Sequence, residues 1–69
     1  MSHMLRITDS TGDTRLPYET EDQQAVDAVA FQFDQFSRKG YAAFADGVKV
    51  KAFNPLAAET IMVAPIVGG

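Results

Sequence analysis

The sequence has no cysteine and no tryptophan, and its single histidine is His3. Zinc sites need several cysteine or histidine ligands, and a cysteine nucleophile or a disulfide needs a thiol. These kinds of site are therefore excluded, and we expect neither a metal nor a cofactor. Without cysteine, the composition gives no information about the redox compartment.

Basic charge is also scarce. Six Lys and Arg face nine Asp and Glu, so the formal net charge is −3 and the sequence pI is about 4.7. Nucleic acids and anionic membranes attract clustered basic residues, whereas those of this chain are scattered along the sequence, so we expect neither as a partner. No apolar run approaches the roughly 18 residues of a membrane span, and no signal peptide is recognisable. We therefore expect a cytoplasmic protein.

Length and hydrophobic content predict one small folded domain. The chain has 69 residues, of which 46% are hydrophobic, far above the range of disordered proteins. We interpret residues 1–3, which precede Met4, as an expression-tag remnant. Residues 4–67 then form the domain, and residues 68–69 form a diglycine tail.

The first half of the chain predicts a β-hairpin. Residues 4–8 alternate apolar and polar side chains, and residues 14–19 form a second strand with Leu16 and Tyr18 inward. Turn-forming residues separate the two strands. Pro17 has no N–H to donate, which indicates an edge strand.

A helix is predicted over residues 21–39. Thr20 and Gln23 have the spacing of a capping box, and Gly40 is a typical residue to end a helix. Apolar side chains recur at helical spacing, at Val26, Val29, Ala30 and Phe33. This stripe predicts that one side of the helix packs on a sheet.

Three further strands are predicted after the helix. Residues 41–45 and 48–53 flank Asp46-Gly47, a strong two-residue hairpin signal. In the second of these strands Val48, Val50 and Ala52 alternate with Lys49, Lys51 and Phe53. Residues 56–59 predict a turn with Leu56 in the core. The last strand is predicted over residues 60–64, with Ile61 and Val63 on one face and Thr60 and Met62 on the other. Pro65 ends this strand because it has no N–H to donate.

The predicted order is β-β-α-β-β-β, which is an α+β fold. We expect a mixed sheet of four to five strands with one amphipathic helix packed on one face. The first and last strands are expected to lie side by side and parallel in the centre of the sheet, because everything between them serves as the crossover connection.

The closing residues 64–69, A-P-I-V-G-G, resemble the tails of the small sulfur-carrier proteins of molybdopterin and thiamine biosynthesis, which often end P-P-V-A-G-G. The preceding residues 54–61, N-P-L-A-A-E-T-I, are similar to the approach to that tail. The order of elements resembles the ubiquitin-like β-grasp superfamily along the whole chain. The hairpin at the start departs from the sulfur carriers and is of the ubiquitin type.

The resemblance implies that Gly69 carries the chemistry. In such proteins an ATP-dependent activating enzyme adenylates the terminal carboxylate, which then becomes a thioester, a thiocarboxylate or an isopeptide; a processing peptidase is a further implied partner. Gly68 and Gly69 lack a Cβ and suit a narrow channel, and Pro65 would stiffen the exit from the sheet. The chain is then a substrate and carrier, not an enzyme.

Two alternatives remain open. The glycines are equally typical of a flexible chain end, and the protein is then a non-conjugating interaction module that binds through its sheet face or an edge strand. Candidate partner-binding residues are Phe53, Lys49, Lys51, Pro65 and Ile66. Packing of Phe53 in the domain and simple solvation of the lysines are the preferred explanations of these residues. A stand-alone enzyme is disfavoured because the chain has no nucleophile, usable histidine or cofactor motif.

Overall fold

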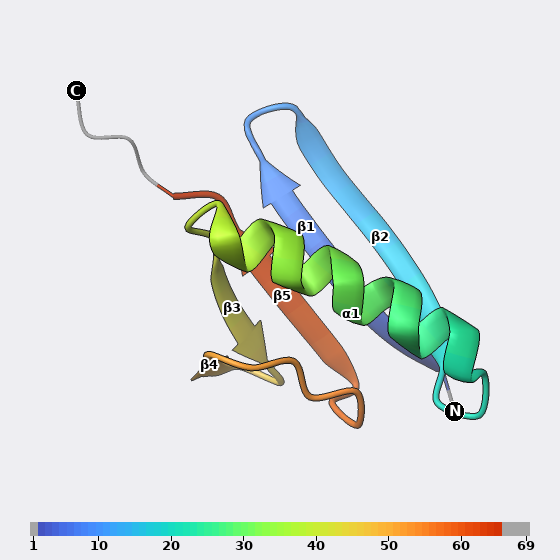
Figure 1. The fold of residues 1–69 in the computed structure, drawn as a ribbon. Coiled ribbons are helices and arrows are strands. Elements are labelled where there is room, and N and C mark those ends of the chain that lie inside the picture. Colours follow the sequence, from blue (N-terminus) through green and yellow to red (C-terminus); the bar gives the residue numbers. More distant parts are fainter. Residues whose placement is uncertain (1, 66–69) are drawn as a thin grey trace.

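The computed structural model describes residues 2–65 and shows one helix lying across one face of a five-stranded mixed sheet (Figure 1). The α+β prediction is therefore confirmed. The strands lie in the order β2-β1-β5-β3-β4. The elements are β1 (Ser2–Asp9), β2 (Gly12–Glu19), α1 (Gln23–Arg38), β3 (Ala42–Ala45), β4 (Val48–Val50) and β5 (Glu59–Val63). No described residue belongs to a helix that is long and apolar enough to traverse a lipid bilayer.

The first and last strands lie side by side in the centre of the sheet, as predicted. β1 pairs with β5 in parallel, with Leu5 opposite Thr60. At one end the Met4 N–H donates to the Ala58 carbonyl (3.1 Å), and at the other the Ala64 N–H donates to the Thr8 carbonyl (3.0 Å). β5 therefore has a hydrogen-bonded neighbour on both sides, because β3 pairs with its other edge.

Pro17 lies on an edge strand at a position where it costs no hydrogen bond. Met4 and Thr8 direct their backbone groups toward β5, so the alternate residues of β1 bond to β2. Pro17 is opposite Met4, and its nitrogen therefore points away from β1. The predicted edge position is confirmed.

The core lies between α1 and the sheet. Val29 and Phe33 of the predicted helix stripe are buried, while Val26 packs at the margin of the core. The sheet contributes the buried side chains Leu5, Ile7, Tyr18, Ala43 and Met62. The fold thus brings together apolar faces that the sequence periodicity had identified separately.

The helix begins later than predicted. Asp22 is the N-cap, and its side chain accepts from the Ala25 N–H (3.2 Å); the predicted capping box at Thr20 and Gln23 is wrong. Asp22 outcompetes Thr20 because a short carboxylate reaches the free N–H groups of the first turn. At the other end Gly40 follows the helix with φ +93°, as expected for the residue after a C-cap.

Two predictions about residues 48–58 are wrong. β4 ends at Val50, not at residue 53. Leu56, expected in the core, is 76% exposed, and Ala57 is buried in its place at 3%. The Asn54 side chain accepts from the Leu56 N–H (3.0 Å) and its carbonyl accepts from Ala57 (3.1 Å). This tight turn aims Ala57 inward and Leu56 outward.

β1 also begins earlier than expected. Ser2 and His3, interpreted above as part of an expression-tag remnant, pair with Glu19 and Tyr18. The His3 ring stacks on Tyr18 with centroids 5.4 Å apart, and its Nδ1 lies 2.8 Å from the Ala57 carbonyl.

Candidate functional site

The last strand delivers the chain to one end of the domain, beside the C-terminal end of α1 (Figure 1). The hydrogen bond from Ala64 to Thr8 keeps the chain on the sheet to that point. Pro65 follows and lies against Gly40, where a Cβ would be 3.8 Å from the Pro65 Cγ. Gly40 itself is fixed by an N–H donated to the Ser37 carbonyl (3.0 Å). The loop between α1 and β3 therefore lies beside the point where the chain leaves the sheet.

The predicted activation residues fall beyond this exit. Gly68 and Gly69, together with the candidate contact residue Ile66, lie outside the described residues. Pro65 is exposed at the exit. The described part of the site therefore ends at Pro65.

A groove of about 300 Å³ lies next to the exit, between the end of α1, the start of β3, and β4. We call it the lysine groove; its lining residues are Ser37, Gly40, Tyr41, Ala42, Ala43, Lys49, Val50 and Lys51. The structure thus brings together the two candidate lysines, which are both exposed. Neither forms a salt bridge with any residue in the range 2–65. Their charge is available to a partner.

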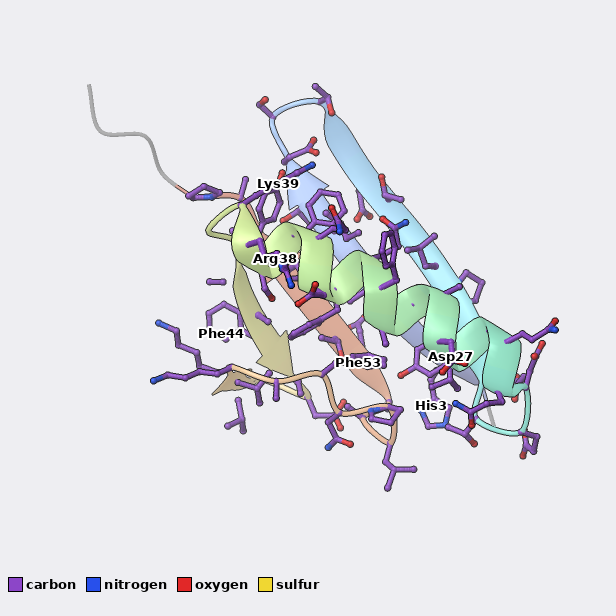
Figure 2. The ribbon with its side chains drawn as sticks, in the orientation of Figure 1. His3, Asp27, Arg38, Lys39, Phe44 and Phe53 are labelled. Atoms are coloured by element: carbon purple, nitrogen blue, oxygen red, sulfur yellow. The ribbon has the colours of Figure 1, made fainter. Side chains whose placement is uncertain are left out.

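Phe53 does not belong to this surface. Because β4 ends at Val50, Phe53 does not share a strand face with Lys49 and Lys51, as the sequence predicted. Its ring packs against the core, with centroids 5.4 Å from Phe33 and 5.9 Å from Tyr18. Figure 2 shows Phe53 close to α1 and separate from Phe44, which lies on β3. Phe53 therefore packs within the domain and is not part of a partner-binding surface with Lys49 and Lys51.

The sheet face that α1 does not cover carries an apolar strip that the sequence did not single out. Ile61 and Val63 alternate with the buried Thr60 and Met62 of β5, so they face outward, and Phe44 is opposite Ile61. Phe44 and Ile61 are half-buried, and Val63 is 41% exposed. The alternation of side chains in residues 60–64 already placed Ile61 and Val63 on a common face. Only the pairing of β5 with β3 shows that Phe44 lies on the same face.

Charged residues elsewhere on that face neutralise one another. Asp13 accepts from Arg6 (3.2 Å) and Arg15 (3.1 Å), and Arg6 also lies 3.6 Å from Glu59. Hydrogen bonds from Arg6 and then Arg15 lower the pKa of Asp13. The same hydrogen bond with Asp13 is the main cause that raises the pKa of Arg6. These groups therefore differ from the lysine groove, whose lysines form no salt bridge within the described range 2–65.

The buried tyrosine has a structural role. Tyr18 donates its hydroxyl to the Pro55 carbonyl (2.9 Å), and burial, with a smaller effect from Asp46, raises the pKa of the phenol. A protonated phenol suits this hydrogen bond. It fastens the segment after β4 to the core, which also supports the position of Phe53.

Among residues 2–65 no group of three or more histidine and acidic side chains is placed to hold a metal ion. Two surface features of the described residues are suited to recognition: the lysine groove, and the apolar strip of Phe44, Ile61 and Val63. Comparisons of the chain with protein-family models, with curated proteins and with solved structures find no match.

Proposed function

We propose that this protein is a ubiquitin-like β-grasp domain that acts as a protein modifier or sulfur carrier through the carboxylate of Gly69. The observation that carries the proposal is the central position of β5, parallel to β1 and leading directly to the C-terminal residues. The initial hairpin and the single helix across the sheet agree with the same family. The proposal requires that the mature protein ends at Gly69.

On this proposal the activated group is the carboxylate of Gly69, which follows β5 in the sequence. The carboxylate of Gly69 attacks the α-phosphate of ATP and displaces pyrophosphate, and a thiol, sulfur donor or amine then displaces AMP. β5 supports this transfer because both of its edges are hydrogen-bonded, which holds the strand in the centre of the sheet up to its end. The activating enzyme supplies the catalytic groups, and the chain supplies the reacting terminus.

The test is pyrophosphate exchange into ATP with activating enzymes from a lysate of the source organism. The intact chain is compared with a chain that lacks Gly68 and Gly69, and with a T11A variant as matched control at the far hairpin turn. Exchange that depends on the intact chain, together with an adenylate or thiocarboxylate mass on Gly69, is expected. Equal exchange with the truncated chain, or none with either beside a working positive-control carrier, refutes the proposal.

The second candidate is a non-conjugating interaction module. The observation that favours it is the apolar strip of Phe44, Ile61 and Val63 on the sheet face that α1 leaves uncovered, because clustered apolar surface commonly marks a protein interface. On this alternative, partner retention on the immobilised chain is lost in F44A and unchanged when Gly68 and Gly69 are removed. If Gly69 is activated instead, removal of Gly68 and Gly69 abolishes the function and F44A does not. The two variants therefore distinguish the two candidate functions.

A further inference from the structure

Basic residues lie at the C-terminal end of the helix, near the end of β5. Arg38 and Lys39 lie at the end of α1 near the exit of β5, whereas Asp27 lies toward the other end (Figure 2). Two of the basic residues near the exit already have a contact. Arg38 pairs with Asp34 (3.0 Å), and the Lys39 ammonium lies 4.8 Å from the centre of the Phe36 ring. Lys49 and Lys51 of the lysine groove have neither kind of contact within residues 2–65.

The lysine groove also borders a free sheet edge. Ala58 and Ala64 direct their backbone groups toward β1, so the alternate residues of β5, including Ile61, direct theirs toward β3. Phe44 pairs with Ile61, and its neighbours Ala43 and Ala45 therefore bond to β4. By the same alternation, the N–H and C=O of Lys49 point away from β3.

No strand within residues 2–65 covers that edge. An added strand would find a backbone donor and acceptor at Lys49, and the exposed side chains of Lys49 and Lys51 two residues apart along the groove. The groove wall includes the apolar surfaces of Val50 and Tyr41, and at the other end of β4 Val48 is 66% exposed. These are the elements of strand addition: backbone bonds for affinity and side-chain contacts for selectivity.

We propose that the lysine groove binds an extended acidic segment of a partner protein, which adds to the free edge of β4. Carboxylates of the segment pair with Lys49 and Lys51, and its intervening side chains contact Val50 and Tyr41. A polypeptide suits the groove better than a nucleic acid because the net charge of the chain is −3 and phosphate backbones require more extensive basic surfaces. The proposal goes beyond activation of Gly69 and holds whether or not that residue is activated.

The test is a titration of the isotopically labelled protein, followed by amide chemical shifts. The probe is a short acetylated peptide that alternates glutamate and threonine; a lysine-threonine peptide of equal length is the control. Glutamate peptide is expected to shift the amides of Ser37, Tyr41 and residues 48–51, and added salt should weaken binding because it screens exposed charges. The lysine peptide should leave these amides unchanged.

Variants locate the binding. The double variant K49E/K51E should weaken the Kd at least about tenfold, since each exposed pair contributes modestly and the reversal replaces attraction with repulsion. K39E is the matched control, because Lys39 does not line the groove, and it should change the Kd much less. Thermal melts verify that the variants fold, and K49Q/K51Q replaces the double reversal if the latter does not.

Removal of residues 66–69 should leave the Kd unchanged, so this proposal and the activation of Gly69 can fail separately. An absence of shifts, an equal response to the lysine peptide, or unaltered binding by K49E/K51E would overturn the proposal. Groove shifts that grow with protein concentration alone would also overturn it and would assign the groove to a contact with a second copy of the chain.

Discussion

Thr60 provides a direct test of how the central strand is stabilised. Its side chain is 0% exposed, and its hydroxyl has no hydrogen-bond partner among the described residues. Its neighbours across the two adjoining strands are Leu5 and Ala45, which are apolar. A buried hydroxyl without a partner costs about 1–3 kcal/mol, and valine has nearly the same shape as threonine.

We therefore expect T60V to increase the free energy of unfolding by about 2–4 kcal/mol. The change removes the cost of the hydroxyl, and the added methyl group contributes roughly 0.8 kcal/mol of further apolar burial. For a domain of this size each kcal/mol raises the Tm by about 4–8 °C. Urea unfolding followed by circular dichroism measures the change, and an unaltered m-value shows that it concerns the folded state.

T8V is the matched control for this substitution. The Thr8 hydroxyl donates to the Met62 carbonyl at 3.1 Å, so the same chemical change removes a formed hydrogen bond and should cost about 0.5–1.5 kcal/mol. Destabilisation by T60V as large as that by T8V would refute the reasoning, because the Thr60 hydroxyl would then have a partner such as a buried water.

Three further predictions concern the turns and the charged face. D46A should lower the free energy of unfolding in urea by about 1–2 kcal/mol, because the Asp46 carboxylate accepts hydrogen bonds from the N–H groups of Ala58 (3.2 Å) and Glu59 (3.0 Å). The Asp46 backbone also has a positive φ of 49°, which aspartate tolerates better than alanine. D46N should lower the free energy of unfolding less, and equal losses for the two variants would contradict this reasoning. G40A should cost about 1–2 kcal/mol in thermal unfolding because φ there is +93°, and an unchanged Tm would exclude strain. The pKa of Asp13 is lowered in the folded protein. Its contribution to stability is therefore present above the unfolded pKa of about 3.9 and is lost as the pH falls through the folded pKa. In an acid titration D13N should lose less stability than the unmodified protein, and an identical acid profile would refute the role of Arg6.

The sequence predicted the parts of the fold that depend on local pattern. The helix stripe at Val29 and Phe33, the Asp46-Gly47 turn and the edge position of Pro17 are all confirmed. Each follows from properties of neighbouring residues: side-chain spacing, a preference for positive φ, or a missing N–H. Predictions that depended on competition between nearby residues were wrong, as when Asp22 instead of Thr20 became the N-cap.

The candidate site was predictable only in part. Lys49 and Lys51 were identified from alternation along one predicted strand, but their position beside the end of α1 depends on the packing of distant elements. Phe53 was assigned to the lysine face because the sequence does not show that β4 stops at Val50. That Phe44 belongs to the apolar strip could not be predicted, because it depends on the pairing of Phe44 with Ile61 across β3 and β5.

The sequence by itself determined the order of elements, the absence of thiol chemistry, and the diglycine at residues 68–69. The tertiary structure decided which face of β5 is buried and which residues surround its end. The physical reason is that alternation divides a strand into two faces without saying which one is covered. Only the packing of α1 on Met62 and its neighbours, and the pairing of β5 with both β1 and β3, made that choice.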